Sequence, residues 1–168
     1  FFGQNNTPIL LITPIDNGIM GIRYIHNPGA YDPDGDSLSY EIVIPMQEKE
    51  YEVTNYRFPN AEEFYNDYAQ GNESGLGPPT FTLDPIVGDL VWDAPGAEGE
   101  YNFAFRVVEW RKVADTWYKL GHVTRDMQVF IKDATNERPI LEAIDPICVD
   151  AGTLIIDTIV GYDPDNND

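Results

Sequence analysis

Short apolar runs with a two-residue period dominate the hydrophobic pattern of the chain. Residues 37–44 alternate strictly, so one face of a strand there would carry Leu38, Tyr40, Ile42 and Ile44. Two later runs do the same, with apolar faces made of Tyr101, Phe103, Phe105 and Val107 and of Val123, Met127, Val129 and Ile131. Such alternation is typical of half-buried β-strands.

Turn residues separate these runs at intervals that suit an all-β fold. Residues 80–84 and 89–93 flank a Pro-Ile-Val-Gly turn and predict a β-hairpin, and Ala-Asp-Thr at 114–116 predicts the tip of another. The apolar runs 8–13 and 21–25 add two short strands. Seven strands at this spacing predict an antiparallel β-sandwich.

Two local patterns refine this prediction. Tyr101 follows a glycine by two positions and precedes Phe103 by two, which is the pattern of the tyrosine corner at the start of strand F in immunoglobulin-like sandwiches. Residues 45–79 interrupt the strand pattern, and Asn60 with Glu63 resembles a capping pair. We therefore expect an immunoglobulin-like sandwich with a short helix in a long inter-strand loop.

Two segments recur at a fixed offset along the chain. Pro-Ile-Leu and Tyr-Asp-Pro-Asp each occur twice, 131 residues apart. Such repetition predicts tandem domains of ordinary size. We expect a linker or the end of a preceding repeat at 1–7, a complete sandwich at 8–133, a linker at 134–138 and the first part of a second repeat at 139–168. The chain is then a piece of a longer protein.

Composition restricts the partners. The 29 acidic residues against 10 basic ones give a net charge of −19, which opposes binding to nucleic acid or to an anionic membrane surface and favours calcium as a partner. No apolar run approaches the roughly 18 residues of a membrane span. The single cysteine, Cys148, is either a small buried hydrophobe, which its apolar surroundings favour, or the partner of a cysteine beyond Asp168.

Catalytic patterns do not emerge from the sequence. His26 and His122 lack a second ligand at a zinc-like spacing, and we expect His122 to lie on a solvated strand face. Ser74 lacks the preceding glycine of a nucleophile elbow. Paired carboxylates such as Glu98 and Glu100 arise by chance in so acidic a chain. We predict a protein that is not an enzyme.

The segments AYDPDGDSLSYEI, FTLDPIVGDLVWDAPGAEGEYNFAFRVVEW and DATNERP together resemble cadherin-like and related immunoglobulin-like tandem repeats of large secreted bacterial surface proteins. The segment YKLGHVTRDMQVFIKD is similar to repeats in proteins of gliding bacteria that carry a gliding-motility-associated C-terminal domain. The resemblance implies a non-catalytic structural repeat of an extracellular cell-surface filament or adhesin. Its partners would be neighbouring repeats of the same or identical chains.

Calcium is the ion that the resemblance implies, held where two domains meet. The ligands at the junction within this chain would be Asp133, Asn136, Glu137, Asp163 and Asp165. Asp32 and Asp34 would serve the preceding junction, and Asp36 would add a third carboxylate close to the same point, as an oxygen-seeking ion requires. The alternative is that Asp-Pro-Asp-Gly is turn chemistry alone, since it suits a type I turn.

Aromatic residues of the 45–79 insertion support an alternative function. In a carbohydrate- or protein-binding module, the rings that would stack on a surface glycan or contact a partner protein are Tyr51, Tyr56, Phe58, Tyr65 and Tyr68. The competing interpretation is that these rings cover the sandwich as a small additional core.

Overall fold

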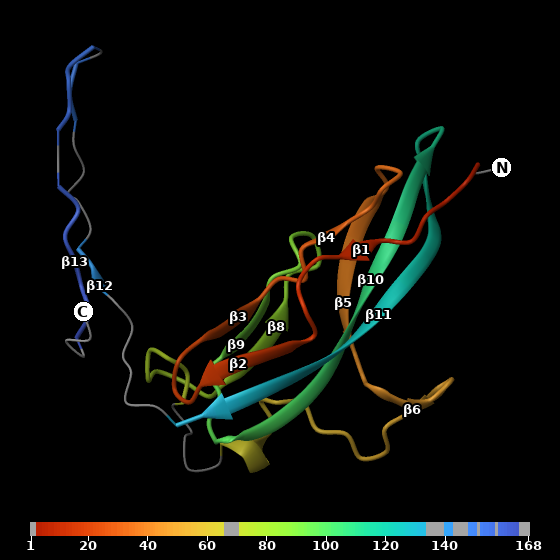
Figure 1. Cartoon of the computed structure of the whole chain (residues 1–168), viewed down its shortest axis with the longest axis horizontal. Coiled ribbons are helices and arrows are strands. Elements are labelled where there is room, and N and C mark those ends of the chain that lie inside the picture. Colours follow the sequence, from red (N-terminus) through yellow and green to blue (C-terminus); the bar gives the residue numbers. More distant parts are fainter. Residues whose placement is uncertain are drawn as a thin grey trace. The chain divides into compact units, whose positions relative to one another are not determined.

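The structure is a computed structural model that describes residues 3–65, 71–133, 140–142, 148–150, 152–156 and 158–164 (Figure 1). The chain divides into two units, residues 1–133 and residues 134–168. Unit 1 contains strands β1 to β11 and unit 2 contains β12 and β13. No helix in the described part of the chain has the length and apolar character needed to cross a membrane.

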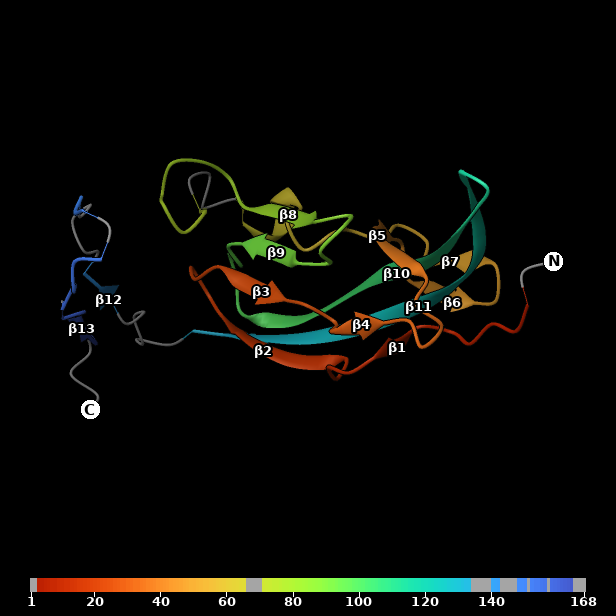
Figure 2. The ribbon, with the colours of Figure 1, turned by 90° about the horizontal axis from the view of Figure 1, so that it is seen from above.

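Unit 1 is an all-β sandwich, as predicted. Its larger sheet has the order β2-β11-β10-β5, formed by β2 (Ile15–Ile19), β11 (Thr116–Lys132), β10 (Gly99–Val113) and β5 (Ser37–Val43). The smaller sheet has the order β3-β9-β8, formed by β3 (Tyr24–His26), β9 (Leu90–Asp93) and β8 (Thr80–Leu83). Figure 2 shows the two sheets as separate layers. Apart from β2, which is parallel to β11, neighbouring strands are antiparallel.

The core fills the space between the layers. The predicted face of β10 is confirmed, because Tyr101, Phe103, Phe105 and Val107 are all buried. From β11, Met127, Val129 and Ile131 are buried, whereas Val123 is only half-buried. Trp92 of the opposite sheet is fully buried and packs edge-on against Tyr101, with 4.8 Å between ring centroids. These large side chains account for the pairing of the two sheets through apolar burial.

Both predicted hairpins are present. In the β8–β9 turn, Asp84 accepts hydrogen bonds of 2.8 Å from the backbone N–H groups of Ile86 and Val87. The β10–β11 turn consists of Ala114 and Asp115, both with positive φ, as a two-residue type I′ turn requires. The tyrosine corner is also present, since the Tyr101 hydroxyl donates a hydrogen bond of 2.8 Å to the carbonyl oxygen of Ala97.

The N-terminal strand differs from its prediction. The expected strand at 8–13 is β1 (Ile9–Leu10), which pairs with β4 (Ala30–Tyr31). The chain then crosses to the larger sheet, where β2 begins after Pro14. A proline cannot donate to a strand ladder, so the chain changes partner there. The strand expected at 21–25 begins later, at Tyr24.

The expected helix is a single 3₁₀ turn, η1 (Glu62–Phe64), in the described part of the insertion. The prediction that Asn60 caps it is wrong, because the turn follows Ala61 and has no side-chain cap. Phe64 instead packs edge-on against Tyr101, with 5.4 Å between ring centroids. Contact with the core therefore positions this turn. The insertion also forms a small hairpin of β6 (Met46–Glu48) and β7 (Tyr51–Glu52).

Unit 2 repeats one strand ladder of unit 1. In unit 1, Ile9 pairs with Tyr31; in unit 2, β12 (Ile140–Leu141) pairs with β13 (Gly161–Tyr162), and Ile140 lies opposite Tyr162. Both members of the second pair lie 131 positions after those of the first. None of the described residues of unit 2 is buried.

Cys148 is exposed, so the interpretation of this residue as a buried hydrophobe is wrong. In the described part of unit 2, β12 and β13 pair over two residues each. This small ladder has no apolar interior that could cover the thiol.

Candidate functional site: an acidic turn at the entry of the chain

The turn between β4 and β5 has its own internal hydrogen bonds. The Asp32 carboxylate accepts hydrogen bonds from the backbone N–H groups of Asp34, at 2.8 Å, and Asp36, at 3.2 Å. Gly35 adopts a φ of +83°, where a side chain is unfavourable. The sequence is therefore used as a turn, as one of the two interpretations predicted.

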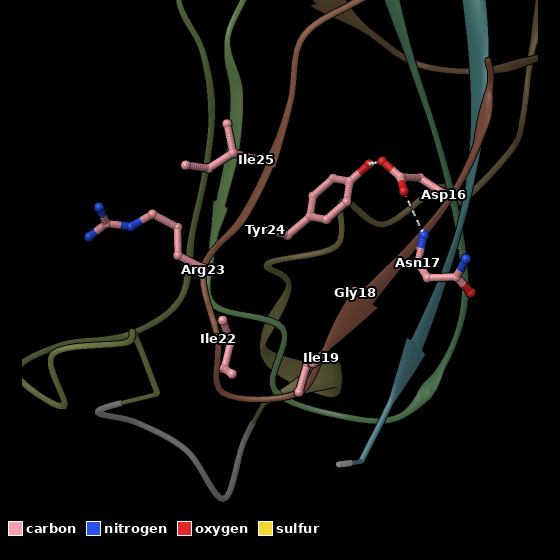
Figure 3. Close-up of a pocket in the computed structure, with 8 residues that line it drawn as sticks. All are labelled: Asp16, Asn17, Gly18, Ile19, Ile22, Arg23, Tyr24 and Ile25. Atoms are coloured by element: carbon pink, nitrogen blue, oxygen red, sulfur yellow. Dashed lines mark hydrogen bonds between the residues drawn. The ribbon is translucent and has the colours of Figure 1, made fainter. Parts of the chain in front are cut away.

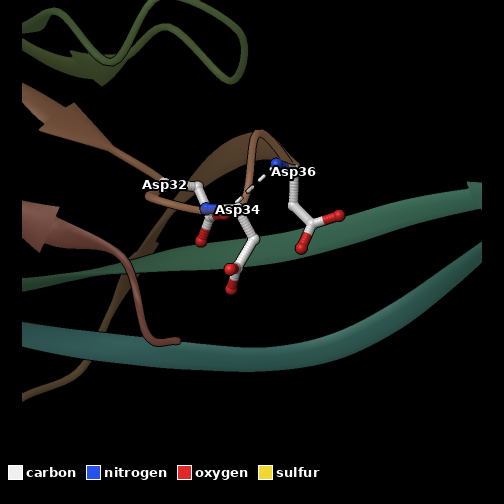
Figure 4. A group of neighbouring side chains, drawn as sticks. All are labelled: Asp32, Asp34 and Asp36. Atoms are coloured by element: carbon white, nitrogen blue, oxygen red, sulfur yellow. Dashed lines mark hydrogen bonds between the residues drawn. The ribbon is translucent and has the colours of Figure 1, made fainter. Parts of the chain in front are cut away.

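The same turn gathers three carboxylates. Asp32, Asp34 and Asp36 each offer a carboxylate oxygen within 4.8 Å of the others (Figure 4). Turn formation and proximity of the carboxylates thus occur together, because the turn itself brings alternate side chains to one side. Oxygens at this spacing suit a hard divalent cation.

The segment that enters unit 1 is attached to this turn. Asn6 donates its backbone N–H to one oxygen of Asp34, at 2.5 Å, and its side-chain amide to the other, at 3.0 Å. Asn5 accepts a hydrogen bond of 2.9 Å from Arg111 of β10. The acidic turn therefore fixes the path by which the chain reaches β1.

Arg111 also anchors the turn to the larger sheet. Its Nε donates to Asp36 Oδ1 at 2.6 Å, and its Nη2 donates to Asp36 Oδ2. The hydrogen bond from Arg111 is the main reason why the pKa of Asp36 lies below its usual value. Bidentate pairing of this kind fixes orientation as well as charge.

Glu109 is the site residue that the sequence interpretation missed. It lies on β10 and is only 1% exposed. Burial is the largest cause of its raised pKa, with the charges of Asp32 and Asp36 adding to it. The sequence did contain a signal, because Glu109 continues the inward-facing alternation of Tyr101, Phe103, Phe105 and Val107. A carboxyl at a core position is unusual enough to mark a site.

The predicted junction ligands lie in both units. Asp133 is exposed at the end of unit 1, where its backbone N–H donates to Glu98 at 2.8 Å. Asp163 belongs to unit 2. Asn136, Glu137 and Asp165 lie outside the described residues. In the sequence, the residues 131 positions before Asn136, Glu137, Asp163 and Asp165 are Asn5, Asn6, Asp32 and Asp34. These four are the residues that unit 1 brings together at its entry.

The insertion aromatics mostly pack on the sandwich. The Tyr56 hydroxyl donates to the carbonyl oxygen of Asn102 at 2.8 Å, and its ring meets Phe58 edge-on. Phe58 in turn lies 6.4 Å from the ring of Phe81, between centroids. Tyr65 is half-buried, Tyr51 is 64% exposed, and Tyr68 lies outside the described residues.

A second polar group lies between β2 and β3, where its members Asp16 and Tyr24 line a hollow of about 260 Å³ (Figure 3). Asp16 accepts a hydrogen bond from the Tyr24 hydroxyl at 3.0 Å, and His26 Nδ1 lies 3.4 Å from the same carboxylate oxygen. His26 is buried, which lowers its pKa, and Asp16 connects the two sheets through these contacts. We regard this group as structural. His122 is exposed on β11, as predicted.

No family model and no curated protein matches the chain.

Proposed function

We propose that the chain is a non-catalytic structural repeat of an extracellular, cell-surface string of domains, in which an acidic turn fixes the linker that enters each domain. The observation that carries this proposal is the attachment of the entering segment to the turn, through Asn6 to Asp34 and through Arg111 to Asn5. A linker held in this way transmits orientation from one domain to the next.

Repetition within the chain supports the proposal. The β1–β4 ladder and the β12–β13 ladder pair equivalent residues at the same offset of 131. Asn5, Asp32 and Asp34 recur at that offset as Asn136, Asp163 and Asp165, whereas Glu137 takes the place of Asn6. We therefore take a neighbouring repeat of the same or an identical chain as the partner, in keeping with the resemblance to cadherin-like surface repeats.

Calcium is the ion we propose at these turns. The turn residues supply carboxylate and amide oxygens, the ligands that calcium prefers. A cation would also reduce repulsion among carboxylates in a chain whose net charge is −19. Stiffening of the junction by the ion would follow from this neutralisation.

The packing of the insertion favours a covering role over glycan or protein binding. Tyr56 and Phe58 direct their rings to each other and towards the core, which leaves little of them free to stack on a ligand. We therefore assign the insertion to the stability of the sandwich.

Thermal unfolding of a chain extended through the second repeat tests the proposal. We expect a higher Tm in millimolar calcium than in excess chelator, because a ligand at a hundred times its Kd adds about 2.7 kcal/mol to the folded state. We expect Asp163→Ala combined with Asp165→Ala to remove most of this difference for the second repeat. Equal Tm values in calcium and chelator would contradict the calcium part. Full retention of the calcium effect in the double variant would contradict the junction assignment.

A further inference from the structure

The end of the β10–β11 hairpin extends beyond the rest of the larger sheet. β5 pairs with β10 only from Ala104 to Trp110, whereas β10 and β11 pair with each other as far as Val113 and Thr116. Figure 1 shows this end of the hairpin projecting past β5. We call residues 110–119 the arm. Within the described part of the chain, no other strand pairs with the arm beyond Trp110.

The arm differs in composition from the chain as a whole. It contains three of the 10 basic residues, one of the 29 acidic residues and two of the three tryptophans. Three basic residues against one acidic residue give the arm a charge of +2, whereas the chain carries −19. In so acidic a chain, a local excess of positive charge indicates a surface for an anionic partner.

The strand register places two tryptophans and two lysines on one face of the arm. Lys112 lies opposite Trp117, and Trp110 lies opposite Lys119. Directly opposite residues of an antiparallel pair share a face, about 5 Å apart, and so do alternate residues of one strand, about 7 Å apart. We call these four side chains the arm face. Each ring of this face therefore has a lysine across the ladder.

The two rings of the arm face suit the binding of a flat apolar surface. Trp110 is held in place, because its Nε1 donates a hydrogen bond of 2.8 Å to the Ser39 hydroxyl of β5. The N–H bond lies in the plane of the indole ring, so this hydrogen bond uses neither face of the ring. Trp117 is 53% exposed and leaves a large apolar area for a ligand to cover.

The two lysines of the arm face can bind anions. The Lys112 ammonium lies 3.0 Å from a carboxylate oxygen of Asp115, whose side chain is 95% exposed. Exposed ion pairs of this kind contribute little, so a carboxylate from a ligand can replace Asp115. Lys119 is exposed and makes no ion pair within the described residues. Both ammonium groups therefore offer charge beside the rings.

We propose that the arm face binds a glycan that carries carboxylate groups, such as an oligosaccharide of uronic acids. Its sugar rings would pack their C–H faces on Trp110 and Trp117, while its carboxylates would pair with the two lysines. Charge complementarity favours this ligand over a neutral glycan, and the aromatic rings favour it over a simple anion.

This inference goes beyond the proposed function, because a structural repeat needs no ligand besides its neighbours. The arm face shares no residue with the acidic turn or with the 45–79 insertion. The acidic remainder of the chain repels an anionic ligand only weakly, because salt screens exposed charges beyond about 8 Å at physiological ionic strength.

Calorimetric titration of the 168-residue chain with tetragalacturonate tests the proposal. The titration is done in excess chelator, so calcium cannot bridge the oligosaccharide to the acidic turn, and the result does not depend on the proposed calcium. We expect saturable binding, and Trp117→Ala should weaken it about tenfold or more, because the ligand loses a stacking surface. Tyr51→Ala removes an exposed ring of the insertion, serves as the control, and should bind like the wild type.

Two further comparisons test the role of charge. The methyl ester of tetragalacturonate lacks the carboxylates and should bind more weakly than the free acid. Lys119→Gln should weaken binding of the free acid about threefold and leave binding of the ester unchanged. Lys132→Gln is the matched control, because it is the same substitution at an exposed position about 40 Å further along β11. The exposed positions of these lysines and of Trp117 should leave the Tm of each variant close to that of the wild type.

Three results would overturn the inference: no saturable binding by the wild type, equal affinity for tetragalacturonate and its methyl ester, or wild-type affinity in both Trp117→Ala and Lys119→Gln. Sedimentation velocity tests a second copy of the chain as the occupant. A wild type that self-associates and does not bind the oligosaccharide, with Trp117→Ala monomeric, would replace the glycan by an interface between copies.

Discussion

Asn6 and Asp34 are 28 positions apart in the sequence and are joined by two hydrogen bonds, of 2.5 and 3.0 Å, in which Asn6 supplies both donors. Asn6 precedes β1, and Asp34 lies in the turn that follows β4, the strand that pairs with β1. The two hydrogen bonds therefore attach the segment before β1 to this turn. A pairing of this kind makes the entering segment part of the domain surface.

Removal of the Asp34 carboxylate should release the entering segment. In Asp34→Ala, the amide proton of Asn6 loses its acceptor, and we expect its hydrogen exchange to accelerate several-fold in native conditions. Because the site is exposed, the global free energy of unfolding should fall by less than about 1 kcal/mol. NMR exchange rates provide the measurement. Unchanged protection of Asn6, with Asp126→Ala as an exposed control on β11, would contradict the attachment.

The pH dependence of stability should reveal Glu109. Its folded-state pKa is raised, chiefly by burial, so the folded state retains a proton that the unfolded state has lost. In chelator, the free energy of unfolding should therefore fall as pH rises from the ordinary pKa of a glutamate through the raised value. Glu109→Gln has no such proton to lose.

Urea unfolding from pH 4 to pH 8 measures this difference. The stability of Glu109→Gln relative to the wild type should increase with pH across that window and then level off. Asp32, Asp34, Asp36 and Arg111 are present in both proteins, so the comparison reports the effect of replacing Glu109. A difference that does not change with pH would show that folding does not raise the pKa of Glu109.

The tyrosine corner should contribute to stability through its hydroxyl. Tyr101→Phe removes the donor to the Ala97 carbonyl and keeps the ring that packs against Trp92. We expect a loss of about 1 kcal/mol, as for a typical intramolecular hydrogen bond. Tyr31→Phe, on an exposed ring of β4, serves as the control and should cost less. Equal effects of both substitutions in chemical denaturation would argue against a corner.

Gly88 should tolerate a methyl group less well than Gly21. Both residues have positive φ, at +84° and +77°, so alanine is strained by about 1 kcal/mol at either position. A Cβ on Gly88 would lie 2.7 Å from the Tyr40 ring, whereas one on Gly21 meets nothing within 4 Å. Gly88→Ala should therefore cost about 1–3 kcal/mol more than Gly21→Ala. Thermal unfolding of the two variants checks this, and equal costs would contradict the contact.

The sequence predicted those elements whose signals are local. The alternation in 99–113 identified the inward face of β10, and the turn residues at 85–88 and 114–116 located both hairpins. The helix cap at Asn60 failed because contact of Phe64 with Tyr101 positions that turn, and no local pattern reports such a contact. The candidate site shows the same difference between local and long-range signals. Proximity of the three aspartates follows from their spacing, but their contacts with Asn6 and Arg111 join residues 28 and 75 positions apart.

The inward position of Glu109 could be predicted from the sequence, whereas its neighbours in the structure could not. Its inward position follows from the alternation of β10, yet its neighbours depend on how the β4–β5 turn folds over that strand. The sequence shows that a charged residue occupies a core position. The groups that stabilise this charge are brought to it by the tertiary structure.

The orientation of one repeat relative to the next tests the central claim most directly. Residual dipolar couplings would be measured for a chain extended through the second repeat, with calcium present, in the wild type and in Asp165→Ala. If the acidic turn fixes the entering linker, both repeats of the wild type should share one alignment tensor, and Asp165→Ala should give each repeat its own. Separate tensors in the wild type would show that the turn does not fix the junction.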